Sequence, residues 1–206
     1  MESFFARHHF WVRRIHSISG VVPIGAFLLE HLFSNAYIFI SPEAYNEHTK
    51  FLTSLPMVVL IELGLIYVPI LLHAAFGLAI VYRGESNIAH YTQFRNWMFF
   101  LQRASGVMAL VFIGVHASTT RIKSFLTGQE MTADTMSAIL KDPLWFWFYV
   151  VGVVMVTFHF ANGLWSFLIT WGITIGKKAQ QVSTALTMGL FVVMGIWGVA
   201  ILLKFT

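Results

Sequence analysis

The sequence predicts an all-α integral membrane protein, a single domain over residues 1–206 with five transmembrane helices. Of the 206 residues, 57% are hydrophobic and only 11% are charged, whereas charged residues make up about a quarter of a soluble domain. Five apolar segments each supply the ~20 residues that a helix needs to cross the hydrocarbon layer. Much of this apolar surface must therefore face lipid.

The predicted spans alternate with short connections that carry charges and turn formers. In chain order, the spans are residues 16–40, 56–82, 98–120, 144–172 and 183–203. The third connection is the longest, and we expect a short amphipathic helix around Thr132–Leu140 on the membrane surface. The basic, aromatic N-terminus has no cleavage site of the A-x-A kind, so the first span is expected to remain in the mature protein.

The composition excludes several classes of function. The chain has no cysteine, which excludes disulfides, thiolate-bound iron–sulfur clusters and cysteine nucleophiles. It has no glycine-rich dinucleotide loop, no phosphate loop and no hydrophilic domain for a polar metabolite. The net charge of +4 is modest, and the basic residues cluster between apolar runs. That pattern indicates membrane topology rather than nucleic-acid binding.

The basic residues orient the helices. Lys and Arg are enriched in cytoplasmic connections, so the side with more of them is expected to be the cytoplasmic one. Eight lie in the N-terminal segment and the second and fourth connections: Arg7, Arg13, Arg14, Arg83, Arg95, Arg103, Lys177 and Lys178. Five lie on the other side: Lys50, Arg121, Lys123, Lys141 and Lys204. The N-terminus is therefore expected in the cytoplasm and the C-terminus outside.

Four histidines, one in each of the first four spans, are the strongest functional signal. They are His31, His73, His116 and His159. Ionisable residues inside a membrane are rare and usually functional. A neutral imidazole that bonds between helices would explain one such residue, but one in each of four spans favours a shared role.

Depth sorts these histidines into two pairs. At 1.5 Å per residue, His31 and His116 lie about 24 Å and 28 Å from the cytoplasmic ends of their spans. His73 and His159 lie about 27 Å and 21 Å from the outer ends of spans that run the other way. The first two therefore form an outer pair, and the other two an inner or middle pair.

The same pairing follows from a weak internal repeat. Ser19-Gly20-Val21 precedes His31, as Ser105-Gly106-Val107 precedes His116. The motif H-x-x-x-G-L follows at His73 and again at His159. The offsets of 85 and 86 residues indicate a tandem helix-pair repeat, although similarity this weak could also arise by chance among glycine-rich membrane helices.

Two facing imidazoles in a dry interior suit haem iron. Zinc usually needs four ligands, whereas haem iron needs two axial ligands, and a closed coordination sphere favours electron transfer. We therefore predict that the first four spans form a bundle around two b haems. Gly77 and Gly163, one turn after His73 and His159, would leave room for a flat macrocycle or a neighbouring helix.

Basic residues near the cytoplasmic ends of the spans are candidates to bind haem propionates. They are Arg14, His16, Arg83 and Arg103. Anchoring of helices at the lipid headgroups would also explain them. Two haems at different depths would carry electrons across the membrane from a partner protein to a lipid-soluble acceptor, for which a quinone is the obvious candidate.

Several segments resemble one known family. RRIHSISGVVPIGAFLLEH, PILLHAAFG, QFRNWMFFLQR and FHFANGLWSFLITWGIT are similar to the membrane cytochrome b subunits of succinate dehydrogenase/fumarate reductase. The similarity is to the single-subunit, five-helix, two-haem cytochrome b558 type, and it runs from about Arg13 to Thr174. The last span matches only in length and hydrophobicity.

The resemblance implies a role in succinate:quinone oxidoreductase in a bacterial cell membrane. A flavoprotein carrying the dicarboxylate site and an iron–sulfur protein would dock on the cytoplasmic face. The family's axial ligands map onto His31, His73, His116 and His159, with the same pairing. Electrons would pass from succinate to menaquinone near the outer haem, or in reverse as a fumarate reductase.

Quinone chemistry also needs protons, and polar residues in the outer half are candidates to supply them. They are Glu62, Glu30, Asn35, Thr119 and Arg121. A charged, unpaired carboxylate in lipid is costly, so both glutamates should face the bundle or stay protonated. A protonated carboxyl that bonds between helices is the plainer alternative.

Two alternative functions remain open at this point. A di-haem cytochrome b of a hydrogenase or formate dehydrogenase would also use quinone, but FRNWMF argues against it. A histidine-lined proton or metal transporter would need polar surroundings, whereas Phe158, Phe160, Leu72, Val115 and Leu32 flank the histidines.

Overall fold

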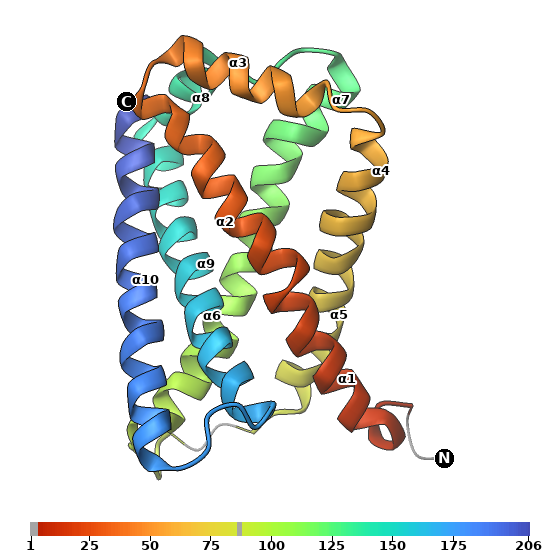
Figure 1. The fold of residues 1–206 in the computed structure, drawn as a ribbon, viewed down its shortest axis with the longest axis vertical. Helices are drawn as coiled ribbons and strands as arrows, with labels where there is room; N and C mark the ends of the chain where they lie inside the picture. Colours follow the sequence, from red (N-terminus) through yellow and green to blue (C-terminus); the bar gives the residue numbers. More distant parts are fainter. Residues whose placement is uncertain (1–3, 86–87) are drawn as a thin grey trace.

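The computed structural model describes residues 4–85 and 88–206, and all regular structure in these two ranges is helical. Five helical segments are long and apolar enough to cross a membrane: Phe10–Phe39, Val58–Arg83, Phe94–Thr127, Pro143–Thr170 and Lys177–Phe205. The predicted all-α membrane fold with five spanning helices is confirmed. The N-terminus and C-terminus lie at opposite ends of the molecule (Figure 1), as an odd number of spans requires.

The first span is a bent helix in three pieces. Helix α1 (Phe4–Val21) is followed by α2 (Pro23–Asn35) and a 3₁₀ turn, η1 (Ala36–Phe39). Pro23 lies at the first position of α2, where its ring removes a backbone donor from the helical ladder and favours a bend.

The second and third spans each contain a π-helical turn near the same end of the molecule. Span two consists of α4 (Val58–Glu62), the π-turn η2 (Leu63–Tyr67) and α5 (Val68–Arg83). Span three consists of α6 (Phe94–Ala117), the π-turn η3 (Ser118–Ile122) and α7 (Lys123–Thr127). π-Turns are rare and frequently occur at functional sites.

Two further long helices and two surface helices complete the fold. The fourth and fifth spans are α9 (Pro143–Thr170) and α10 (Lys177–Phe205). The surface helix α8 (Ala133–Leu140) confirms the predicted amphipathic helix, while α3 (Pro42–Thr53) occupies a segment that we expected to be a simple connection. Pro42 at its first position and the Ser41 hydroxyl, which accepts from the Ala44 amide at 3.1 Å, initiate α3.

The surface helices cap what we call the outer end of the bundle (Figure 1). There Tyr45 of α3, Met136 and Leu140 of α8 and Phe205 of α10 share one buried apolar cluster. The Asn46 side chain accepts from the Ala133 amide at 2.8 Å, which joins the two surface helices. The opposite, inner end holds the N-terminus and the starts of α6 and α10.

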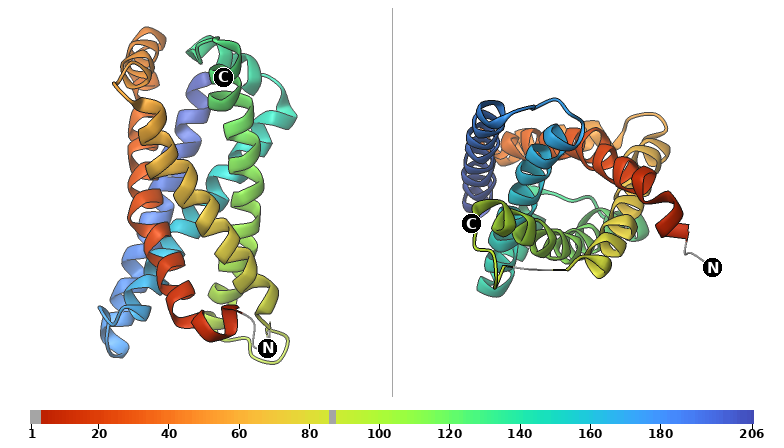
Figure 2. Two further views of the ribbon diagram at one scale, coloured as in Figure 1. Left: turned by 90° about the vertical axis from the view of Figure 1, so that its right-hand side faces the viewer. Right: turned by 90° about the horizontal axis from the view of Figure 1, so that it is seen from below.

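The first four spans form a ring, seen from below in Figure 2. Helix α1 packs against α5 and α9, and α6 packs against the same two helices. Spans one and three therefore face each other diagonally, as do spans two and four. Helix α10 lies outside the ring against α9, in keeping with its lack of a histidine.

Several spans extend beyond their predicted bounds. The first begins at Phe10 rather than residue 16, the third ends at Thr127 rather than residue 120, and the fifth begins at Lys177 rather than residue 183. The added turns carry Lys and Arg, which continue a helix readily and extend their charged ends into the interface. Hydropathy therefore located the apolar centre of each span but not its ends.

Candidate functional site

The inner histidine pair meets across the ring. His73 of α5 and His159 of α9 have ring centroids 6.1 Å apart, with ring planes at 86°. Their helices face each other diagonally, and these two side chains meet in the space between them. The structure thus places together the two residues that depth had paired.

A neighbouring helix fixes the orientation of His73. Its Nδ1 lies 2.9 Å from the His16 carbonyl oxygen and 3.2 Å from Ser19 Oγ, and Ser19 donates to the same carbonyl at 3.0 Å. A carbonyl can only accept, so the neutral ring carries its hydrogen on Nδ1. The lone pair is then on Nε2, which is the form that binds a metal.

The other half of the repeat holds His159 in the same way. Its Nδ1 lies 3.0 Å from the Gln102 carbonyl oxygen and 3.3 Å from Ser105 Oγ. Ser105 in turn donates to that carbonyl at 3.2 Å. The internal repeat in the sequence is therefore a repeat of contacts, with Ser105 in the place of Ser19 and Gln102 in the place of His16.

Glycines allow the two inner imidazoles to lie directly on a helix backbone. A Cβ at Gly20 would lie 2.5 Å from Cε1 of His73, and one at Gly106 would lie 2.7 Å from Cε1 of His159. Either distance is far inside van der Waals contact. The Ser-Gly motif therefore supplies both a hydroxyl and the space for a ring.

Gly77 and Gly163 allow a neighbouring helix to approach closely. A Cβ at Gly77 would lie 3.1 Å from Cε1 of His16, and one at Gly163 would lie 3.1 Å from Nε2 of Gln102. Of the two roles considered for these glycines, the contacts match close approach of a neighbouring helix. The Gln102 amide donates to the His159 carbonyl oxygen at 3.1 Å across that contact.

Asn162 supports the same contact. Its side-chain nitrogen donates to Gln102 Oε1 at 2.7 Å and to the Met98 carbonyl oxygen at 3.0 Å. This buried amide therefore fixes Gln102, whose carbonyl oxygen accepts from His159.

The outer pair is held differently. The ring centroids of His31 and His116 lie 5.8 Å apart, with planes at 72°. His116 Nδ1 lies 3.2 Å from the Tyr149 hydroxyl, a side-chain partner in place of a backbone carbonyl. Phe112, one turn earlier, stacks on His116 at 5.6 Å, and Phe27 lies 5.3 Å from His31 in the corresponding position.

The four propionate candidates divide into two groups. Arg83 and Arg103 line a small cavity of about 90 Å³ together with Arg13. Arg103 donates to the Glu85 carbonyl oxygen at 3.1 Å, while its buried Nε has no partner within the part of the chain that the structure describes. Three cationic side chains therefore surround one cavity at the inner end of the bundle.

The other two candidates make different contacts. The Arg14 guanidinium lies over the Trp171 ring at 4.5 Å and over the Phe10 ring at 5.2 Å. The His16 ring stacks on the His73 ring at 3.9 Å and 18°, and its Nδ1 lies 3.0 Å from the His73 carbonyl oxygen. His16 thus supports an inner histidine directly.

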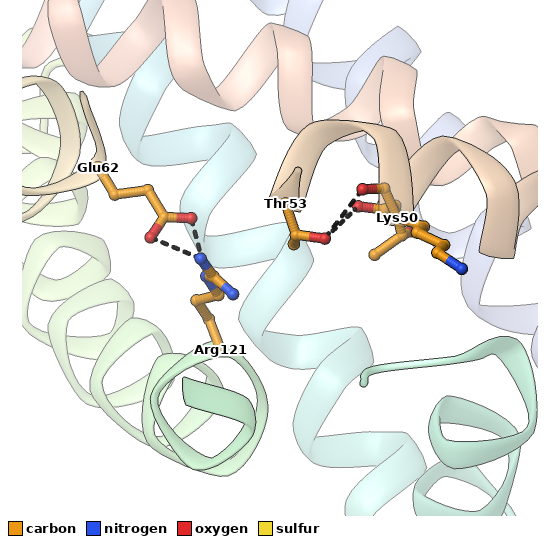
Figure 3. Close-up of polar contacts among 5 residues, drawn as sticks. Lys50, Thr53, Glu62 and Arg121 are labelled. Carbon is orange, nitrogen blue, oxygen red and sulfur yellow. Dashed lines mark hydrogen bonds and ion pairs between the residues drawn. The ribbon is translucent and has the colours of Figure 1, made fainter. Parts of the chain in front are cut away.

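Two of the quinone candidates form an ion pair at the outer end. Arg121 Nε and Nη2 donate to the two oxygens of Glu62 at 2.8 Å and 3.0 Å (Figure 3). The side chains are 20% exposed for Glu62 and 28% for Arg121. Glu62 ends α4 just before one π-turn, and Arg121 lies within the other, so both irregular turns occur at this pair.

The remaining candidates make local contacts. Asn35 donates to the His31 carbonyl oxygen at 2.7 Å, and Thr119 donates to the Val115 carbonyl oxygen at 2.8 Å. Both bonds stay within one span. Glu30 accepts a hydrogen bond from Ser34 of the same helix.

The sequence did not identify His48 as part of this region. Its Nε2 lies 2.9 Å from Ser34 Oγ, and its ring stacks on Tyr37 at 3.9 Å and 6°. His48 lies on α3, the helix that we expected to be a connection. Its contacts with span one had no signal in the sequence.

Comparison with known proteins identifies the family of this chain. The family model described as the succinate dehydrogenase/fumarate reductase transmembrane subunit matches residues 86–202. The chain belongs to this family. It is also 40% identical over 196 residues to the succinate dehydrogenase cytochrome b558 subunit of Bacillus subtilis (strain 168), and the match covers 95% of this chain and 96% of that relative.

Family membership decides between the alternatives left open by the sequence. The chain is a multi-pass membrane subunit of an oxidoreductase complex, which confirms the resemblance. A histidine-lined transporter and a cytochrome b of a hydrogenase or formate dehydrogenase do not belong to this family. The roles of individual residues stay predictions.

Proposed function

We propose that this chain is a two-haem cytochrome b subunit of succinate:quinone oxidoreductase. In this proposal His73 and His159 are the axial ligands of an inner haem b, and His31 and His116 are those of an outer one. The observation that carries the proposal is the meeting of two imidazole pairs across the diagonals of a helical ring. The cytochrome name of the Bacillus subtilis relative supports it.

The geometry of both pairs fits an axially ligated iron. A metal–imidazole bond is about 2 Å long, so two rings on opposite sides of one metal have centroids about 6 Å apart. The two pairs lie at 5.8 Å and 6.1 Å. In both inner rings the carbonyl contact leaves the Nε2 lone pair free for a metal. When bound, the two haems supply one-electron carriers at two depths in the membrane.

The chain's own residues would prepare the ligands. The hydrogen bonds at Nδ1 fix the tautomer, hold the ring orientation and raise the basicity of the ligating nitrogen. Phe27 and Phe112 beside the outer pair help to exclude water. A dry site with a low dielectric constant is what a carrier that only exchanges electrons requires.

Arg83 and Arg103, joined by Arg13, are the residues that we assign to inner propionates. They surround one cavity at the inner end, and the buried Nε of Arg103 has no partner among the described residues. A carboxylate there would satisfy that donor and reduce the repulsion among three cations. The contacts of Arg14 and His16 give them different roles, at Trp171 and His73.

We place menaquinone chemistry at the outer end, beside the outer pair. Glu62 lies directly before one π-turn and Arg121 lies within the other, and both side chains are partly exposed. The ion pair keeps a charged carboxylate stable at membrane depth, from which it can exchange protons with a quinone. We assign no such role to Asn35 and Thr119, whose side chains bond within their own helices.

The remaining parts of the proposal concern topology and partners. The N-terminus and the starts of α6 and α10 lie in the cytoplasm of a bacterial cell, and the C-terminus lies outside, because Lys and Arg are enriched at the inner end. A flavoprotein with the dicarboxylate site and an iron–sulfur subunit dock on that cytoplasmic face. The complex oxidises succinate or, in reverse, reduces fumarate.

A difference spectrum tests the function directly. The purified complex, reduced with succinate and compared with its oxidised form, should show b-type haem bands, with two haems for each copy of this chain. Menaquinol analogues should reduce the same haems in the absence of succinate. A complex that oxidises succinate but contains no b-type haem would contradict the proposal.

A further inference from the structure

A second site lies at the inner end, outside the ring that holds the histidines. A groove of about 460 Å³ runs between the start of α6, the end of α9 and the start of α10. Its lining includes Arg95, Lys177, Gln180, Phe94 and Trp165. None of these residues belongs to the histidine pairs or to the arginine cavity.

The groove carries positive charge without a compensating acid. Arg95 and Lys177 line it from two helices, and the described lining residues include no aspartate or glutamate. Arg95 donates a hydrogen bond to Gln180 of α10, which holds the guanidinium across the groove. The groove is therefore complementary in charge to an anion.

The N-termini of two helices add to this positive charge. Helices α6 and α10 both begin beside the groove, and neither of their N-cap residues, Gln93 and Gly176, makes a side-chain capping bond within the described chain. The first amides of a helix lack partners inside it and carry a partial positive charge. Both helix ends thus favour an anionic ligand at the same place.

Trp165 is independent evidence for a ligand site in the groove. Its side chain lines the groove and is only 7% exposed. The indole Nε1–H has no hydrogen-bond acceptor in the described ranges of the chain. A buried donor without an acceptor is costly, and a ligand oxygen would remove that cost.

We propose that this groove binds the phosphodiester headgroup of an anionic phospholipid. Basic pockets between transmembrane helices on the cytoplasmic side are suited to anionic headgroups. Phe94 and Trp165 supply aromatic walls at the depth of the interface.

Native mass spectrometry of the delipidated complex tests the proposal with dioleoyl phosphatidylglycerol and dioleoyl phosphatidylcholine as added probes. We expect preferential retention of phosphatidylglycerol. Arg95→Gln and Lys177→Gln should each weaken it about fivefold, as expected for one charge near an anionic headgroup. Lys178→Gln is the matched control because it removes a neighbouring charge that does not line the groove, and it should leave retention unchanged.

Two further variants separate binding from folding. Arg95→Lys keeps the charge and should retain phosphatidylglycerol, and Trp165→Phe keeps the aromatic wall but removes the donor and should weaken retention. Equal retention of both lipids, or an equal loss in Lys177→Gln and Lys178→Gln, would overturn the proposal. Displacement of the lipid by millimolar inorganic phosphate would also overturn it, because the site would then recognise a free anion.

Discussion

The inner and outer histidine pairs have similar geometry but are held by different kinds of contact. At the inner pair, a backbone carbonyl and a serine hydroxyl hold each imidazole, and a glycine allows each ring to lie on a helix. At the outer pair, Nδ1 of His116 contacts the side-chain hydroxyl of Tyr149. No substitution removes a backbone carbonyl. Side-chain substitutions should therefore disturb the hydrogen bonds at Nδ1 less at the inner pair than at the outer pair.

The difference follows from the internal repeat. Residues 16, 19, 20 and 73 make contacts that recur 86 positions later, at residues 102, 105, 106 and 159. The inner pair lies where the two helix pairs are most alike. Near the outer pair the halves diverge, with a bend at Pro23 in one and a π-turn at Ser118–Ile122 in the other.

The largest expected effect is the loss of one haem on removal of any paired histidine. His73→Leu or His159→Leu should remove the inner haem, and His31→Leu or His116→Leu the outer one, because iron with one axial ligand is held weakly. The haem content of the purified complex should fall by about half. His48→Leu is the control, since His48 lies outside both pairs, and it should keep the full content.

The glycines beside the inner rings should produce the next largest effect. Gly20→Ala or Gly106→Ala places a methyl group 2.5 Å or 2.7 Å from an imidazole carbon, and overpacking of this kind costs about 1–3 kcal/mol. We expect loss or distortion of the inner haem spectrum while the outer one persists. Gly114→Ala, in the same helix as Gly106, should leave both spectra unchanged, because a Cβ there would have no described atom within 4 Å beyond its own helix backbone and chain neighbours.

Substitution at the outer ion pair should affect turnover with quinone but not haem content. Glu62→Gln removes the carboxylate and leaves Arg121 without its bidentate partner. We expect quinone reduction with succinate to fall about 100-fold or more, in the range seen when a proton-transfer group is lost. Glu47→Gln changes an exposed carboxylate on α3 and should have no effect. Normal turnover in Glu62→Gln would remove this residue from the quinone site.

The smallest effects should come from the side chains that hold Nδ1. Tyr149→Phe removes the hydroxyl beside His116, which makes the ligand less basic and should raise the outer haem potential by some tens of millivolts. Ser19→Ala should shift the inner potential less, because the His16 carbonyl still accepts from His73. Redox titration of both variants compares the sizes of these two shifts in haem potential. A larger shift in Ser19→Ala would contradict the comparison.

Particular residues show how far the sequence could predict this structure. Counting residues along each span was enough to pair His31 with His116, because depth along a helix is fixed by its rise. The Ser-Gly repeat indicated a duplication, yet its contacts with the following histidine depend on how two helices rotate against each other. That rotation is set by packing over the whole interface.

Contacts between distant segments were beyond sequence reasoning for the same reason. Glu62 and Arg121 were separate candidates, and nothing in the sequence joined them, because each π-turn shifts the helical register where it occurs. Helix α3 was missed since its apolar face is short and it does not cross the membrane. The contact of His48 with Ser34 was not predicted for the same reason.

The most direct test of the pairing compares two double variants. The same-pair variant His31→Leu/His116→Leu should retain one haem for each copy of this chain, because the inner ligands are intact. The crossed variant His31→Leu/His73→Leu should retain none, since each site has lost a ligand. One haem retained in the crossed variant and none in the same-pair variant would contradict the assignment of these four histidines.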